Sequence, residues 1–283
     1  MRRKEKQMNK KSLMRTSPAF PHIVWSVIFI VLPLFFVLYY AFTDYDGKFT
    51  FANIVGLSDY TQTFLLSVSM SVIATIICVL IAYPLAYFIS KAKPEHRKMM
   101  LFLVLVPMWI NLLIRTYSMM AIMDDEGFLN KILSSLHLGT VHLIGTKGAV
   151  LFGIVYDFLP YMVLPIFTVI NKLDPSLIEA SNDLGCSKIQ TLFRVILPLT
   201  KSGIISGVTM VFVPSISTFY ISQKLGGGTF DLIGDTIERQ FSNPTTYNIG
   251  AAISLVMMIL ILLSLYIMNK FTNADDEEGG MIP

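Results

Sequence analysis

The sequence predicts an all-α polytopic membrane protein with six transmembrane helices and both termini in the cytoplasm. Of its 283 residues, 54% are hydrophobic and 14% are charged, whereas soluble domains usually carry about 25% charged residues. Apolar stretches long enough to cross a hydrocarbon core of about 30 Å recur along the chain. Lysines and arginines gather in alternate connecting segments. These observations leave no room for a separate soluble domain.

Six apolar spans follow one another. We place them at residues 23–42, 68–89, 99–123, 149–170, 203–222 and 249–268. The first has a long polar lead and no small-x-small cleavage pattern, so we expect it to stay as a helix and not to be removed as a signal peptide. Prolines interrupt several spans, which fits either a translocation pathway or ordinary kinking for packing.

The charge distribution sets the orientation. Sixteen lysines and arginines lie before the first span, in the second and fourth connecting segments and in the tail, against five in the other connections. The positive-inside rule places the basic segments in the cytoplasm. We therefore divide the chain into a basic cytoplasmic segment (1–22), a six-helix transmembrane domain (23–268) and an acidic cytoplasmic tail (269–283), whose NADDEEGG stretch is typical of disorder.

A charged, helix-forming stretch, residues 174–198, separates the fourth and fifth spans. Asp174 followed by Pro175 is typical of a helix start, because aspartate caps the first turn and proline fits the first helical position. Gly185 can adopt the left-handed conformation that ends a helix. We expect a first short helix over these residues, outside the bilayer.

A second helix follows directly. Ser187 and Gln190 have the spacing of a capping box, and we expect the helix to run to Pro198. On the first helix, the small residues Ala180 and Ser181 would let another surface approach closely. Because short helices are marginal in water, this hairpin needs a packing partner.

The same stretch resembles the EAA loop, E-A-A-x3-G-x9-I-x-L-P, of permease subunits in bacterial ABC importers, with serine for the second alanine and valine for isoleucine. The resemblance implies the type I, MetI-like permease architecture. In that family the loop forms a coupling helix that inserts into a cleft of the cytoplasmic ATPase. It implies the following ATPase-coupling residues: Glu179, Ala180, Ser181, Asp183, Gly185, Leu197 and Pro198.

The chain has no sequence pattern for chemistry of its own. It lacks a G-x4-G-K-[ST] phosphate-binding loop, and GTVHLIGTKG has the wrong spacing. Cys78 and Cys186 lie at different depths, so no disulfide or metal framework is implied. We expect no catalytic residues, no metal and no cofactor in this chain, with ATP and magnesium held by a separate ATPase.

A finer resemblance covers nearly the whole chain. The stretches NLLIRTYSMMAI, VYDFLPYMVLPIF and FVPSISTFYISQKLGGGTFDLIGDTIERQF are similar to the B-type permeases of spermidine/putrescine importers. This resemblance implies a polyamine substrate and a multi-pass location in the bacterial inner membrane. It also implies three partners, namely a homologous C-type permease, an ATPase dimer and an extracytoplasmic polyamine-binding protein. It implies no nucleic-acid partner.

Asp157 is the only carboxylate within a predicted span, about 12 Å from its outer end. Such residues normally face a cavity or a partner. One hypothesis makes Asp157 an anionic step for a polyamine, and the other pairs it with Arg115, at about the same depth on a neighbouring span. Candidates for aromatic walls of a substrate path are Trp109, Tyr156, Tyr161 and Tyr220.

Other functions stay open at this point. The chain could be a permease for another solute such as iron(III), thiamine or sulfate. A membrane-embedded enzyme is disfavoured because all four histidines lie outside the spans or at their edges. A scaffold that uses the charged stretch only to bind a partner is a third alternative, which ATP-dependent uptake would separate from a transporter.

Overall fold

The computed structural model describes residues 20–279, with side chains described up to residue 270. The predicted segments 1–22 and 269–283 therefore lie partly outside the described residues. The described chain is helical, with one lone β-bridge between Thr43 and Phe49. The predicted all-α class is confirmed. The chain forms two compact units, residues 1–58 with 239–258, and residues 59–238 with 259–283.

The first unit begins with one apolar helical span. It consists of α2 (Phe20–Ser26), the π-helical η2 (Val27–Val31) and α3 (Leu32–Ala41), followed by α4 (Ala52–Val55). Apart from Ala41 at its end, no residue of the hydrophobic span over residues 20–41 is buried, which suits a helix surrounded by lipid. The carbonyl of Thr43 accepts hydrogen bonds from the side chains of Asn53 and Asn248. These amides hold the turn after α3.

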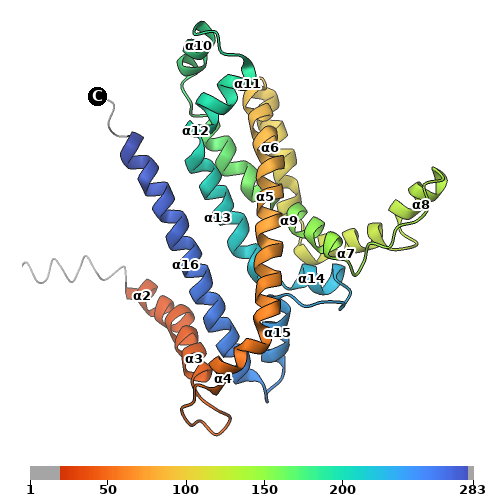
Figure 1. Cartoon of the computed structure of the whole chain (residues 1–283), viewed down its shortest axis with the longest axis vertical. Helices are drawn as coiled ribbons and strands as arrows, with labels where there is room; N and C mark the ends of the chain where they lie inside the picture. The colour runs from red at the N-terminus through yellow and green to blue at the C-terminus, as the bar shows by residue number, and fades with distance from the viewer. Residues whose placement is uncertain (1–19, 280–283) are drawn as a thin grey trace, which may run out of the picture. The chain divides into compact units, whose positions relative to one another are not determined.

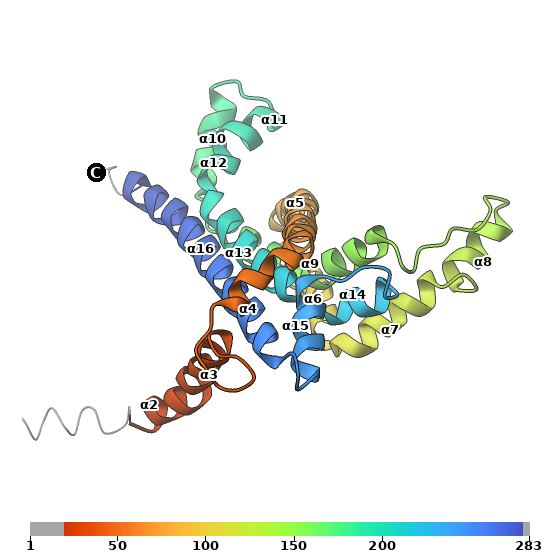
Figure 2. The same cartoon turned by 60° about the horizontal axis from the view of Figure 1, so that its bottom comes forward.

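Three long helices form the centre of the second unit (Figures 1 and 2), namely α5 (Thr61–Lys91), α9 (Lys147–Ile170) and α13 (Lys201–Ser217). Residues at four-residue spacing lie on one helix face. On α5 that face is small and fully buried, with Ala74, Cys78, Ala82 and Ala86. Small side chains let membrane helices approach closely, so this face positions α5 against the centre of the unit.

The predicted third span, residues 99–123, is wrong as one continuous helix. It is divided into α6 (Pro94–Trp109) and α7 (Leu112–Met123), and the chain bends by 94° at the break. Ile110 is extended, and the side chain of Asn111 accepts a hydrogen bond from Leu113 N at 2.8 Å, which starts a new helix. A window-averaged hydropathy does not detect such a cap, because a single asparagine hardly changes the average.

The predicted fifth span, residues 203–222, also ends too late. Helix α13 stops at Ser217, Thr218 is extended, and α14 (Tyr220–Leu225) begins after it. The hydroxyls of Ser215 and Ser217 donate to carbonyls of the preceding turn, which competes with continued helix. Four helices are long and apolar enough to cross a membrane, or up to six if each bent pair counts as one span.

The remaining helices are shorter, apart from the last. They are α8 (Phe128–Ser135), α10 (Pro175–Asp183), α11 (Lys188–Thr191), π-helical η4 (Leu192–Ile196), α12 (Leu197–Leu199), the 3-10 helix η3 (Gly56–Tyr60), α15 (Ile233–Ser242) and α16 (Tyr247–Gly279). Helix α16 extends to Gly279, so the expectation of disorder from residue 273 is wrong there. Adding residues to a formed helix costs little compared with starting one.

Candidate coupling site and translocation path

A helical hairpin, residues 174–199, lies at one end of the three central helices of its unit (Figure 1). The predicted start is confirmed, because the Asp174 side chain accepts a hydrogen bond from Ser176 N at 2.9 Å and Pro175 is the first helical residue. That hydrogen bond holds the pKa of the Asp174 carboxyl below its ordinary value.

Gly185 ends α10 with a φ of +79°, as predicted. Cys186 N donates to Ser181 O at 3.1 Å, and Gly185 N donates to Asn182 O at 2.9 Å. This pair of hydrogen bonds is the Schellman arrangement, which satisfies the last helix carbonyls and needs a left-handed residue. The glycine therefore sets the angle between the two arms of the hairpin.

The second arm begins with the predicted capping box. Ser187 N donates to Gln190 Oε1 at 2.8 Å, and Gln190 N donates to Ser187 Oγ at 3.3 Å. The helix does not end at Pro198 but at Leu199, with the π-helical stretch η4 before the proline. Since Pro198 has no N–H to donate, the preceding turn widens and the helix continues.

Ser181 does not face outward as expected. Its hydroxyl lies 2.9 Å from Thr191 Oγ1, and both residues are buried. The position where this sequence departs from the EAA pattern thus joins the two arms of the hairpin. A buried hydroxyl without a partner would be costly, and each of these two supplies the other's partner.

Other predicted coupling residues lie on the surface. Glu179, Ala180, Asp183, Gly185 and Pro198 are exposed, and Leu197 is partly buried. Sequence reasoning missed four exposed apolar side chains on the same hairpin, namely Leu177, Leu184, Ile189 and Phe193. Leu184 is 85% exposed and Ile189 69% exposed.

Asp157 of α9 and Arg115 of α7 are brought together, and Arg115 lies just after the break in the third span. Arg115 Nε lies 2.5 Å from Asp157 Oδ1, and their side chains are 10% and 1% exposed. Arg115 also donates to the carbonyl of Pro107 at 3.0 Å and lies over the Tyr156 ring at 5.9 Å. Among the described residues, neither Asp157 oxygen has a hydrogen-bond partner, so the carboxylate is held by charge alone.

A cavity of about 650 Å³ opens beside this pair, between α7 and α9. Arg115 and Tyr156 line it, together with apolar side chains such as Ile114, Met119 and Phe152. Asp157 itself is not among its lining residues. The arrangement therefore presents the cation of the pair to the cavity and keeps the anion behind it.

The four candidate aromatic residues do not form one wall. Tyr156 lies at the ion pair, and Tyr161 packs against Phe158. Trp109 is 76% exposed and packs against Phe102. Tyr220 belongs to a separate cluster described next.

Tyr220 meets Tyr117 edge to face, with ring centroids 6.3 Å apart. The ammonium of Lys224 lies 5.4 Å from the Tyr117 centroid and 5.8 Å from that of Tyr220. The four-residue spacing of Tyr220 and Lys224 on a helix could have suggested that pair. Tyr117 could not be found from sequence, since it comes from a distant helix.

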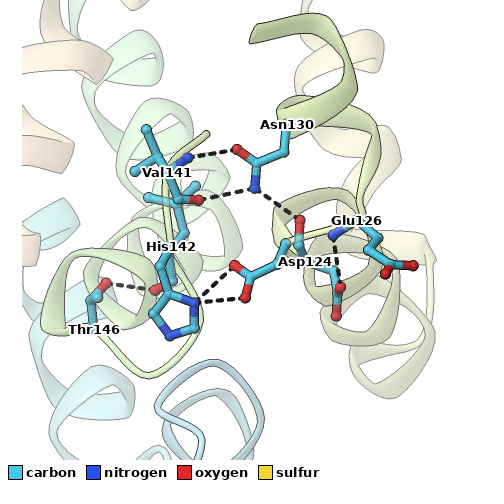
Figure 3. Close-up of polar contacts among 8 residues, drawn as sticks. Asp124, Glu126, Asn130, Val141, His142 and Thr146 are labelled. Carbon is cyan, nitrogen blue, oxygen red and sulfur yellow. Dashed lines mark hydrogen bonds and ion pairs between the residues drawn. The ribbon is translucent and has the colours of Figure 1, made fainter. Parts of the chain in front are cut away.

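A polar junction holds the loop at the far end of α7. Figure 3 shows the Asn130 amide between the Val141 backbone, with hydrogen bonds of 2.8 and 2.9 Å, and the Asp124 carbonyl at 3.2 Å. Nearby, His142 Nδ1 lies 2.8 Å from Asp125 Oδ1. Asn130 is buried, so it fixes the return of the chain toward α9.

The broken membrane helices and the exposed hairpin between α9 and α13 define a transport permease. The chain belongs to the family of binding-protein-dependent transport system inner membrane components, whose model matches residues 13–274. It is therefore a multi-pass protein of the bacterial inner membrane, built as a transport permease.

Relatives make the comparison finer. The spermidine/putrescine transport system permease protein PotB of Haemophilus influenzae is 39% identical over 262 residues, which cover 88% of this chain and 92% of the relative. PotB of Escherichia coli (strain K12) is 39% identical over 255 residues, covering 86% and 92%. The predicted resemblance to B-type spermidine/putrescine permeases is confirmed.

Solved structures support the fold. A bacterial ABC transporter that imports the acidic polysaccharide alginate matches with a TM-score of 0.74 at 18% identity, over 94% of this chain and 99% of that chain. The MetNI methionine ABC transporter matches with a TM-score of 0.58 at 15% identity, over 76% and 94%. These likenesses confirm the MetI-like permease architecture.

Proposed function

We propose that this chain is the B-type permease subunit of an ATP-driven polyamine importer, for spermidine or putrescine. The observation that carries the proposal is the 39% identity, over most of the chain, with permeases of that transport system. In this proposal a homologous C-type permease, an ATPase dimer and an extracytoplasmic polyamine-binding protein complete the complex. ATP and magnesium act in the ATPase.

The helical hairpin would be the ATPase contact. Its exposed apolar side chains, Leu184 and Ile189 among them, support a protein partner for the hairpin. Glu179 and Asp183 lie on the same hairpin and would add polar contacts at the rim. ATP binding would draw the hairpins of the two permeases together and open the path outward, and hydrolysis would reset it.

The Tyr117–Tyr220 pair supports an alkylammonium substrate. A lysine side chain is itself a primary ammonium on an alkyl stem, and Lys224 places that group over both rings. A polyamine end has the same chemistry, so it would fit the same two aromatic faces when Lys224 moves aside. Tyr156 is less suited, because Arg115 already covers its ring.

Asp157 has a different place in this proposal. With Arg115 at 2.5 Å its charge is largely neutralised, so it offers little field to a passing cation in this conformation. It would act on polyamines only if Arg115 left it. The ion-pair hypothesis is therefore the one that the geometry supports.

Radiolabelled spermidine uptake by proteoliposomes containing the complete complex tests the substrate. We expect ATP-dependent uptake that excess unlabelled putrescine suppresses and that iron(III), thiamine and sulfate leave unchanged. Tyr220→Leu should lower uptake about fivefold, while Tyr161→Leu serves as a matched control because that ring packs on Phe158. If the wild type does not accumulate spermidine, the polyamine assignment fails and iron(III), thiamine or sulfate becomes the candidate substrate.

The ATPase contact has its own test. Leu184→Ser, Glu179→Arg and Gly185→Asp should each reduce ATPase binding and uptake while the protein stays folded. Leu138→Ser is the matched control, since it removes a leucine that is 69% exposed in the connection between α8 and α9. Normal transport by all three hairpin variants would contradict the coupling role.

A further inference from the structure

Arg97 lies where α5 and α9 of the second unit end and α6 begins. It belongs to the first turns of α6, and its guanidinium donates to Ser90 O at 2.8 Å and Ala92 O at 3.2 Å, at the end of α5. Its other terminal nitrogen donates to Asn171 Oδ1 at 2.5 Å. Asn171 is the residue directly after α9. One side chain therefore ties α5, α6 and α9 together.

The guanidinium suits this task because its planar fork directs several donors at fixed angles. Two of those donors satisfy carbonyls that the end of α5 leaves unpaired. The third reaches across to a different helix. A lysine could not make these contacts together, since its ammonium is a single point of charge.

Asn171 is connected tightly to the helical hairpin. Only four residues separate the ends of α9 and α10, and they are held by turns, with Lys172 N donating to Val169 O at 3.1 Å and Leu173 N to Ile170 O at 3.2 Å. Asp174, the last of the four, is the cap of α10. A displacement of the hairpin therefore also displaces Asn171, because the connection between them is short and held by hydrogen bonds.

The hairpin also packs beside this junction. A small cavity of about 210 Å³ is lined by Arg97 and Asn171 and by Ile178 and Ile196 from the two arms of the hairpin. The space leaves room for the hairpin to shift against the ends of α5 and α6. The hydrogen bond between Arg97 and Asn171 lies at the edge of that space.

Helix α6 has polar attachments at its two ends and packs against the core through partly buried apolar side chains of its middle. None of its residues is buried within this chain. Arg97 fixes its beginning, and at its other end the Pro107 carbonyl accepts a hydrogen bond from Arg115, the partner of Asp157. A helix with no fully buried side chain and with polar attachments at both ends can move as a rigid body.

We propose that Arg97 is a positioning residue that transmits the motion of the helical hairpin to α6 through Asn171. Displacement of the hairpin pulls Asn171, the guanidinium carries the pull to α6, and α6 passes it to the break at residues 110–111 and to the Arg115–Asp157 pair. This inference rests on the proposed function, in which an ATPase moves the hairpin.

Asn171 is the better residue to change, because it is exposed and its loss leaves the bonds of Arg97 to α5 intact. Asn171→Ala should lower the spermidine taken up per ATP hydrolysed by about fivefold, with ATPase activity retained. Asn171→Asp keeps the acceptor and should restore the wild-type ratio. Lys172→Ala, at the exposed neighbouring position, is the matched control.

Uptake and ATP hydrolysis are measured on the same proteoliposomes of the complete complex. Arg97→Gln combined with Asn171→Ala should be no worse than Arg97→Gln alone, because both changes remove one link. Additive losses, or an unchanged ratio in Asn171→Ala, would overturn the proposal. A wild-type complex without ATP-dependent uptake would instead overturn the proposed function.

Discussion

The hydroxyl of Tyr83 lies 3.0 Å from Thr200 Oγ1, which links the membrane helix α5 to the residue directly after the helical hairpin. Thr200 is fully buried, and its hydroxyl also donates to Ile196 O at 2.8 Å. The exit of the hairpin is thus attached to α5 directly, whereas its entrance is attached through Asn171 and Arg97.

Tyr83→Phe should lower the free energy of unfolding by about 1 kcal/mol, because it removes this hydrogen bond and keeps the ring. The loss stays small since Thr200 keeps its carbonyl acceptor. Thermal unfolding in detergent checks the effect. Tyr87→Phe is the control, because Tyr87 contacts Lys91 through its ring, and an equal loss in both variants would argue against the Thr200 contact.

Removing the charge of Arg115 from the Arg115–Asp157 pair should lower the free energy of unfolding more than removing the charge of Asp157. Arg115→Gln leaves a buried carboxylate without its cation, and we expect a loss of about 3 kcal/mol in unfolding free energy. Asp157→Asn should cost less, because Arg115 keeps the Pro107 carbonyl and the Tyr156 ring. Thermal unfolding of both variants in detergent measures the difference.

The double variant Arg115→Gln with Asp157→Asn decides what the carboxylate does. A structural pair predicts that the double variant is more stable than Arg115→Gln and takes up more spermidine than Asp157→Asn. If uptake is abolished in Asp157→Asn with normal assembly, and the double variant does not recover it, the carboxylate belongs to the substrate path. That outcome would contradict the ion-pair interpretation.

Gly203 allows α13 to lie against α9. A Cβ at this position would meet the Pro165 carbonyl oxygen and the Val169 side chain at 3.0 Å. Gly203→Ala should therefore destabilise the protein by about 1 to 2 kcal/mol through overpacking. Gly56→Ala is the control, since nothing lies within 4 Å of its Cβ, and it should be neutral or slightly stabilising. Thermal unfolding compares the two.

The cap of α10 should depend on pH through Asp174. The folded-state pKa of this carboxyl is lowered by the hydrogen bond from Ser176 N, so its stabilisation is present above the pKa of an unfolded aspartate, about 3.9. It is lost as pH falls through the lowered folded value. The protection of α10 amides against hydrogen exchange, taken as the ratio of intrinsic to observed rate at each pH, should therefore fall in acid.

Asp174→Asn is the matched variant for that measurement. Asparagine also accepts the hydrogen bond of a helix start but does not titrate in this range. The protection of α10 in the variant should stay flat over the pH interval in which the wild type loses it. An equal loss of protection in both proteins would assign the effect to other groups.

Most local features of the hairpin followed from sequence. The Asp174 cap, the left-handed Gly185 and the Ser187–Gln190 box are each made within a few residues, so residue type and spacing suffice to predict them. The first, second, fourth and sixth apolar spans followed from composition for the same reason. The depth of Asp157 and Arg115 could be counted along two helices, which explains why their meeting was one of the two hypotheses.

What was missed depends on packing between distant segments. The break after α6 needed the Asn111 cap, whose effect on direction no average of hydropathy contains. The inward position of Ser181 needed Thr191 on the other arm of the hairpin. Tyr117 joined Tyr220 only because α7 and α14 come together, and a pattern within either helix does not contain that contact.

The sequence by itself determined that this is a polytopic helical membrane protein with a capped hairpin between its fourth and fifth spans, because bilayer thickness and helix caps act on neighbouring residues. Only the tertiary structure decided which side chains attach that hairpin to the membrane helices. Arg97 meets Asn171, and Tyr83 meets Thr200, across 74 and 117 residues of chain. Their partners are fixed by how α5, α9 and α13 pack, and that packing is a property of the whole unit.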